Sequence, residues 1–166
     1  MKKSVPFKFA MALCCVLALA ACSKKNTTNL EAGIGPGAGQ AMPGSEQDFA
    51  VNVGDRIYFE NDQSSLTAEA QETLRRQAQW LQQYPGVMIQ VEGHADERGT
   101  REYNIALSAR RATATREFLI AQGVTASRIS SIAYGKERPA ALCDAEQCWS
   151  QNRRAVTVIT GGAKTS

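Results

Sequence analysis

A short charged segment in the middle of the chain carries the residue types best suited to ligand chemistry. It contains His94, Asp96, Glu97 and Arg98, and it follows residues 87–91, in which apolar side chains alternate with polar ones. That alternation is typical of a half-buried strand, and a carboxylate between a strand and the next helix lies where ligands often bind in α/β proteins. Judged from the residue types alone, Asp96 is more often a turn or capping residue than a ligand-binding one.

Arg111 is the second residue suited to binding a ligand. The inward positions of the helix expected after the charged segment are spaced by three and four and are occupied by Asn104, Leu107, Arg111, Thr115 and Phe118. A guanidinium on an apolar helix face is costly unless it meets an acid. Arg111 and Asp96 therefore either form an internal ion pair or are both offered to a ligand that carries both charges. The residues alone leave this choice open.

Four ordered motifs give the chain a resemblance to a known family. They are GHADERGT at residues 93–100, YNIALS at 103–108, RRA at 110–112 and NRRAV at 152–156. Together they resemble the OmpA-like peptidoglycan-binding domain over residues 51–159. Within that family they are most similar to the lipoproteins of the Tol-Pal system. Several motifs in one order make this resemblance far more specific than any single short pattern.

The resemblance implies a binding site for the diaminopimelate residue of peptidoglycan stem peptides, whose short side chain carries an ammonium and carboxylates. It assigns the ammonium to Asp96 and a carboxylate to Arg111, and an arginine fork suits a carboxylate. Backbone amides around Ala95 to Glu97 would hold further carboxylate oxygens. The family often has threonine at the position of Ala95, which matters little if only the backbone is used there.

Three more positions match ligand contacts of the family. Asp62 would border the pocket, with a loop turn or a helix cap as its alternative role. Asn104 is expected to steady the loop by hydrogen bonds, and Leu107 is expected to belong to the core more than to the contact surface. Asn61 stands where the family tends to have an aromatic residue, so an apolar wall of the pocket is expected to be missing.

The sequence indicates neither catalysis nor metal binding. His94 is the only histidine, and no paired nucleophile or metal-ligand cluster accompanies it, so we expect a structural role. Arg153 and Arg154 are expected in an ion pair or on a solvated edge. We therefore predict a binding protein, not an enzyme, with no cofactor and no metal.

The first residues predict a targeting signal. Three lysines precede an apolar run at residues 9–21 that is too short for a comfortable membrane span. The run ends in Leu19-Ala20-Ala21-Cys22, which resembles a bacterial lipoprotein signal. Residues 1–21 would be removed and Cys22 would carry lipid. By the same resemblance, Ser23 and Lys24, with no aspartate, fit an outer-membrane anchor and a periplasmic domain.

Composition divides the rest of the chain. Residues 22–54 are rich in glycine and contain few large apolar side chains, so we predict a flexible tether after the lipidated cysteine. Residues 55–160 are expected to form the binding domain, with a short tail at 161–166. Three of the 19 basic residues lie in the leader, so 16 basic and 16 acidic residues remain, and nothing suggests nucleic acid as a partner.

Periodicity and capping signals predict two helices and four strands in the order β-α-β-α-β-β. The first helix should start after Thr67, bury one face and end at residues 84–86, and the second should end near Gly123. Strands are expected at residues 56–59, 87–91, 129–134 and 155–159. We predict an α/β two-layer sandwich, with both helices on one face of a mixed four-stranded sheet, as in the OmpA-like fold.

Cysteine positions predict one disulfide. Cys14 and Cys15 would leave with the leader and Cys22 would carry lipid, so Cys143 and Cys148 remain in a compartment expected to be oxidising. We expect them to form a bridge that braces a short loop.

The predicted function is a non-catalytic anchor between outer membrane and peptidoglycan. The resemblance also implies the periplasmic β-propeller protein TolB and other Tol-Pal proteins as partners, with a role in cell division. The alternatives are another OmpA-like envelope lipoprotein, a cell-wall hydrolase and a flagellar stator. The sequence offers no hydrolytic machinery, and a stator needs an uncut membrane helix.

Overall fold

The computed structural model describes residues 41–165. The helices are α1 (Glu46–Asp48), η1 (Phe49–Gly54), α2 (Ala68–Gln83), α3 (Arg101–Ala121), η2 (Ala126–Arg128) and α4 (Glu146–Asn152). The strands are β1 (Arg56–Tyr58), β2 (Met88–Gly93), β3 (Ile129–Ala133) and β4 (Arg154–Gly161). No helix within these residues is long and apolar enough to cross a membrane. The signal at residues 1–21, Cys22 and the first part of the predicted tether lie outside the described residues.

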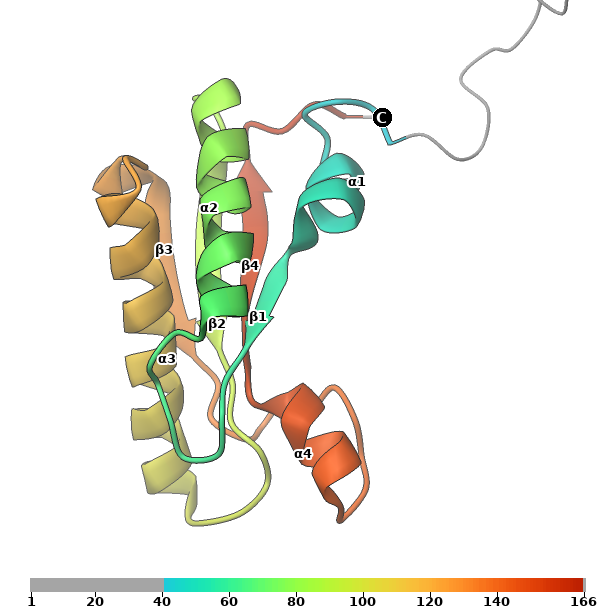
Figure 1. Cartoon of the computed structure of the whole chain (residues 1–166), viewed down its shortest axis with the longest axis vertical. Helices are drawn as coiled ribbons and strands as arrows, with labels where there is room; N and C mark the ends of the chain where they lie inside the picture. The colour runs from blue at the N-terminus through green and yellow to red at the C-terminus, as the bar shows by residue number, and fades with distance from the viewer. Residues whose placement is uncertain (1–40, 166) are drawn as a thin grey trace, which may run out of the picture. The chain divides into compact units, whose positions relative to one another are not determined.

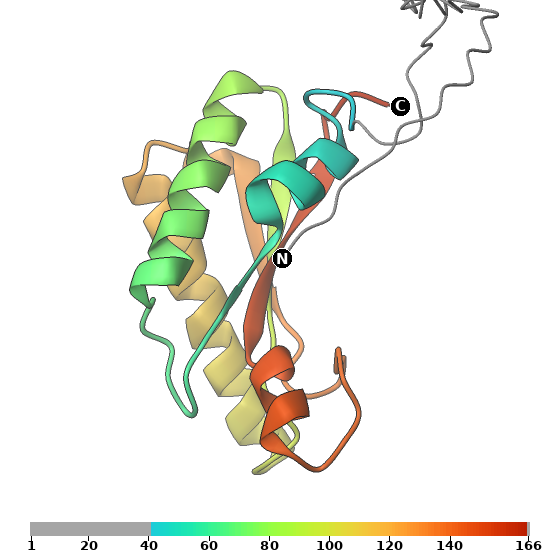
Figure 2. The ribbon, with the colours of Figure 1, turned by 45° about the vertical axis from the view of Figure 1, so that its right-hand side comes forward.

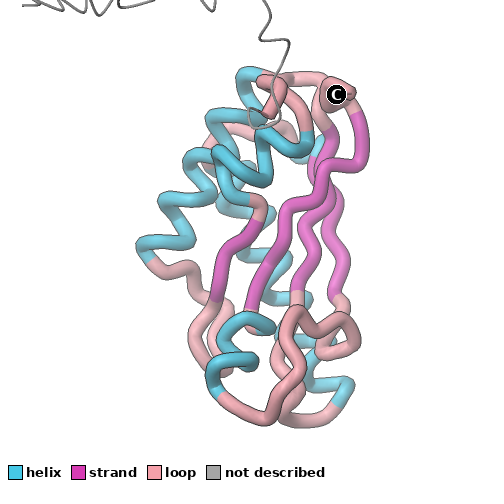
Figure 3. The backbone as a smooth tube through the Cα atoms, turned by 90° about the vertical axis from the view of Figure 1, so that its right-hand side faces the viewer, coloured by secondary structure: helices cyan, strands magenta, loops and turns pink. Residues whose placement is uncertain are grey.

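The four strands form one mixed sheet in the order β1-β4-β2-β3 (Figure 1). β4 runs antiparallel to both of its neighbours, whereas β2 and β3 are parallel and are joined through α3. Figure 3 shows the strands side by side, with the long helices on one side of them. The predicted two-layer sandwich with a mixed sheet is therefore confirmed.

Helices α2 and α3 cover one face of the sheet (Figure 2). The inward face predicted for α2 is buried, and its residues Leu74 and Leu81 pack with Ile89 and Val91 of β2 in the core. The Thr67 side chain caps α2 by accepting a hydrogen bond from the Ala70 N–H. Apolar periodicity and a local cap thus determine this helix together.

Helix α3 lies unusually close to the end of β2. A Cβ at Gly93 would lie 2.0 Å from the carbonyl oxygen of Ser108, so only glycine permits this approach. Thr100 caps the start of α3 through the Tyr103 N–H, and Gly123, with a φ of +95°, follows its end as predicted. The close contact fixes α3 beside the loop that carries the charged segment.

The folded part begins earlier than the sequence suggested. The tether was expected to continue through residue 54, but α1 and η1 occupy residues 46–54, and Phe49 is buried against Trp80. The indole N–H of Trp80 donates to Asp48 at 2.8 Å. The C-terminal boundary also moves, because β4 continues to Gly161 and the Lys164 N–H donates to the Gly44 carbonyl. A few apolar and polar contacts thus order the last part of the predicted tether.

A fourth helix, α4, was not predicted. Its seven residues precede β4 and carry no side-chain cap at Ala145, so the local start signal is weak. Cys148 in α4 is joined to Cys143 by a disulfide, with the Cα atoms 5.7 Å apart. Asn152 at the end of α4 accepts from the backbone N–H groups of Ala140 and Ala141, which ties the preceding loop to the helix. The bridge and these bonds hold a segment that sequence periodicity does not mark.

Candidate binding site

The candidate site lies where three segments meet at one end of the sheet. The loop after β1, the loop after β2 and the α4 segment gather at the lower end of the view in Figure 1. A cleft of about 350 Å³ opens between the first two loops and the start of α3. It is lined by Asn61, Asp62, Asp96, Arg98, Gly99, Tyr103, Asn104 and Leu107. Four predicted contacts, namely Asp62, Asp96, Asn104 and Leu107, are therefore brought together.

Asp96 is the buried acid of this cleft, and two arginines approach it. The Arg98 Nη2 lies 2.5 Å from Oδ2, and the Arg98 Nε lies 3.2 Å from Oδ1. The Arg153 Nη1 lies 3.5 Å from Oδ2. The Asp96 side chain is only 9% exposed, and that of Arg98 is 38% exposed. The acid is thus fixed in the cleft wall, while its main partner reaches solvent.

The electrostatic setting keeps Asp96 ionised. Burial by itself raises the pKa of Asp96. Hydrogen bonds from the Arg98 side chain and backbone, together with the charge of Arg153, lower the pKa by more than burial raises it, so the pKa lies below its usual value. The site therefore presents a carboxylate at neutral pH. Such a group suits a cationic ligand atom.

Arg98 is held by residues from two other segments. Its Nη2 donates to the Asn61 Oδ1 at 2.7 Å, and its guanidinium lies 4.1 Å from the centre of the Trp149 ring. The Trp149 indole N–H in turn donates to Glu97 at 2.9 Å. Asn61, at the position where an aromatic wall was expected to be missing, therefore has a polar contact of its own.

Arg111 lies behind the cleft and does not line it. Its side chain is fully buried, and its three nitrogens donate to the carbonyls of Gln63, His94 and Glu60 at 2.8, 2.9 and 3.2 Å. Burial lowers its pKa to about 10, with Asp96 opposing the shift, so it stays charged at neutral pH. The alternative in which Arg111 forms an internal ion pair with Asp96 is therefore wrong, because the arginines that pair with Asp96 are Arg98 and Arg153.

The rim of the cleft combines Asp62 with the first turns of α3. Asp62 has a φ of +56°, which aspartate tolerates in turns, and it accepts a hydrogen bond from the Tyr103 hydroxyl. The Asn104 side chain donates to the Arg98 carbonyl at 2.7 Å, so it steadies the loop as predicted. Leu107 is 5% exposed and still contributes an apolar patch to the cleft.

Three residues of the charged segment lie outside the cleft lining. The Ala95 N–H donates to the Gly135 carbonyl at 2.8 Å and is already used. The Glu97 side chain turns to Trp149. His94 is 2% exposed, and burial with the nearby charges of Arg154 and Arg138 lowers its pKa to about 4. The structural role expected for His94 agrees with this buried, neutral state.

Arg153, which follows α4, and Arg154, which begins β4, have different surroundings. Arg153 is 4% exposed and pairs with Glu146 of α4 as well as Asp96, so the expectation of an ion pair is confirmed and a solvated edge is wrong. Arg154 is 8% exposed and donates to the Arg138 carbonyl.

Sequence reasoning assigned no ligand role to Arg98 or Tyr103. Both lie within the family motifs, but local spacing does not show that Tyr103 reaches Asp62 or that Arg98 closes on Asp96. The available signal was the short separation of Asp96 and Arg98, which allows an arginine to fold back on an acid two residues away.

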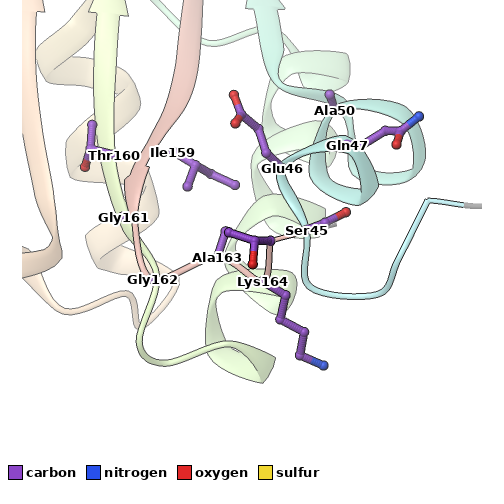
Figure 4. A pocket seen from close by; sticks show the side chains of 11 residues that line it. Ser45, Glu46, Gln47, Ala50, Ile159, Thr160, Gly161, Gly162, Ala163 and Lys164 are labelled. Carbon is purple, nitrogen blue, oxygen red and sulfur yellow. The ribbon is translucent and has the colours of Figure 1, made fainter.

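A larger hollow, of about 850 Å³, lies at the other end of the sheet, between the end of β4 and α1 (Figure 4). Its lining is mostly glycine, alanine and small polar residues, with Glu46 and Lys164 as its charged side chains. None of the predicted site residues contributes to it. The converging charges mark the smaller cleft as the better candidate site.

The fold is that of an OmpA-family domain, since residues 58–154 match the model of the OmpA family. The peptidoglycan-associated lipoprotein of Agrobacterium fabrum is 64% identical over 159 residues, which cover 94% of this chain and 88% of the relative. That of Rhizobium meliloti is 63% identical over 152 residues, covering 91% and 86%. The chain belongs to the peptidoglycan-associated lipoproteins of the OmpA family, as its motifs predicted.

Solved structures agree with this assignment. The crystal structure of the peptidoglycan-associated lipoprotein from Burkholderia pseudomallei has a TM-score of 0.62 and 40% identity, covering 64% of this chain and 90% of that one. The C-terminal domain of Helicobacter pylori MotB has a TM-score of 0.61 and 27% identity, covering 64% and 84%. The domain is therefore shared by proteins with different names.

Proposed function

We propose that this protein is a non-catalytic anchor that binds peptidoglycan through the diaminopimelate residue of stem peptides. The observation that carries the proposal is the buried, ionised Asp96 in a cleft whose surroundings also hold three arginines. The names of its relatives support peptidoglycan as the partner.

The charges match the ligand in a specific way. Diaminopimelate carries an ammonium for Asp96 and carboxylates for guanidinium groups, and charge-assisted hydrogen bonds in a sheltered cleft are strong. Arg111, assigned to a carboxylate by family resemblance, lies behind the 60–63 loop that its nitrogens hold. Each of its terminal nitrogens carries two hydrogens and uses one of them, so a carboxylate can bind there once the loop moves aside.

The proposed placement in the envelope rests on the sequence at the front of the chain. Lipid on Cys22 would fix the protein to the outer membrane, and the segment before α1 would let the domain reach the wall in the periplasm. We propose that it acts in the Tol-Pal system, with TolB as a protein partner and a role in envelope integrity and division.

The test compares two ligands on the full-length protein in detergent. Calorimetry is run with a stem tripeptide ending in meso-diaminopimelate and with a matched tripeptide ending in lysine, which has the amine but lacks the extra carboxylate. We expect at least roughly tenfold tighter binding of the diaminopimelate peptide, because one charge-assisted contact contributes about 1.5–3 kcal/mol. Asp96→Asn should lose binding by a similar factor.

The matched control is Glu117→Gln, which removes an exposed carboxylate of α3 outside the cleft. It should bind as the unaltered protein does. Failure to bind the diaminopimelate peptide would sink the proposed function. Release of soluble fragments from purified sacculi by the protein alone would instead favour a hydrolase.

A further inference from the structure

Asp96 is not free to receive a ligand in this structure. Both of its oxygens accept hydrogen bonds from Arg98, through Nε at 3.2 Å and Nη2 at 2.5 Å, and the Arg98 N–H adds a third at 3.2 Å. The guanidinium of Arg98 therefore stands where the ammonium of a ligand would bind. A ligand cation therefore competes with it for Asp96.

We infer that Arg98 is an exchangeable counter-ion that makes the cleft selective for a ligand with both charges. The ligand's ammonium replaces the Arg98 side chain at Asp96, and the released guanidinium takes a carboxylate of the same ligand. This inference rests on the proposed function and adds a residue that decides which stem peptide is bound.

Exposure separates Arg98 from Arg111 in this role. The side chain of Arg98 is 38% exposed at the cleft, whereas Arg111 is fully buried with its nitrogens bonded to three carbonyls. Arg98 can therefore change partner by rotating its side chain, without moving the backbone of a neighbouring loop. It is the first guanidinium that an entering carboxylate meets.

Contacts around Arg98 keep it near the cleft after it leaves Asp96. Its guanidinium stacks on Trp149, and Asn61 accepts from its Nη2. Trp149 is itself fixed by its hydrogen bond to Glu97 and by its place in α4, beside the disulfide at Cys148. These contacts hold the guanidinium without depending on Asp96.

The acids near Arg98 already have partners. The charges of Glu146 and Glu97 reach it and help to raise its pKa, although Asp96 contributes most. Glu146 pairs with Arg153, and Glu97 accepts from the Trp149 indole. A ligand side chain that brings only an ammonium would thus leave Arg98 without its main acid, whereas one that also brings a carboxylate restores a pair. The cleft then binds the ligand with the additional carboxylate more tightly, because only that ligand leaves Arg98 paired with an acid.

The experiment measures both stem tripeptides on the full-length protein and on Arg98→Gln. The substitution removes the competitor at Asp96 and also the carboxylate contact. We expect the affinity for the lysine peptide to rise and the ratio of diaminopimelate to lysine affinity to fall by roughly tenfold. Arg101→Gln is the control, since it removes an exposed guanidinium that pairs with Glu137 and leaves Asp96 untouched. Its ratio should not change.

A ratio that stays the same or grows in Arg98→Gln would overturn the inference. Loss of both affinities by one common factor would do so too, because it would show a purely structural role. If the unaltered protein binds neither peptide, the proposed function fails instead. A second measurement needs no variant: the NMR signal of the Arg98 Nε–H should shift on adding the diaminopimelate peptide while that of Arg101 stays in place. An unmoved Arg98 signal at saturation contradicts the exchange.

Discussion

The guanidinium of Arg111, in the middle of α3, donates to the carbonyl of His94, the residue just after β2, at a distance of 2.9 Å. The same side chain reaches the carbonyls of Glu60 and Gln63 in the loop after β1. One buried arginine thus joins the three segments that form the back of the cleft. The arrangement of the cleft in this structure depends on it.

We therefore expect Arg111→Gln to destabilise the fold as well as to weaken binding. Glutamine is too short to reach all three carbonyls, and buried acceptors without donors are costly, so the free energy of unfolding should fall by about 3–5 kcal/mol. Denaturant unfolding measures the change. Arg110→Gln, on the exposed face of the same helix, should cost under about 0.5 kcal/mol. Equal stability of the two variants would show that Arg111 has no such structural part.

The disulfide gives a second prediction. In denaturant without reductant, neither Cys143 nor Cys148 should react with a maleimide. Replacing both by serine should lower the free energy of unfolding by about 2 kcal/mol, since the closed loop is short. Two reactive thiols in protein taken from the periplasm would reject the bridge. Calorimetric measurement of the affinity of the double variant for the diaminopimelate peptide would also show how far α4 supports the cleft.

His94 predicts acid sensitivity. Its pKa in the folded protein is about 4, below the ordinary 6.5, so the unfolded chain takes up a proton first as the pH falls. The contribution of neutral His94 to the free energy of unfolding is fully present above pH 6.5 and is lost as the pH drops from there to about 4. Thermal unfolding across this window should show a falling Tm, and His94→Gln should flatten the slope. Parallel curves for the two proteins would contradict this assignment.

The anchor is tested by Cys22→Ser. Without its proposed lipid, the protein should move from the membrane fraction to the soluble periplasmic fraction, and mass spectrometry of the unaltered protein should find an acylated N-terminal cysteine. The fractionation should use wall-free preparations, because binding to peptidoglycan also sediments the domain. A variant that still sediments with outer membranes would show that the anchor is elsewhere.

Local sequence patterns determined most of the fold. The alternation in β2, the inward face of α2, the Thr67 cap and the glycine after α3 each act within a few residues, so a short window is enough to predict them. The resemblance to the family also placed Asp62, Asp96, Asn104 and Leu107 in one site, where the cleft has them. The order of strands and helices follows from these windows together.

Tertiary structure decided the features that depend on contacts between residues far apart in the sequence. Asp48 of α1 and Phe49 of η1 both contact Trp80 and so hold these two elements, and α4 is held by a disulfide and by Arg153. The partner of Asp96 was decided in the same way. An arginine side chain is long and can reach several acceptors, so its choice depends on where the neighbouring segments lie. Burial placed Arg111 on three backbone carbonyls, and exposure at the cleft left Arg98 to close on the acid.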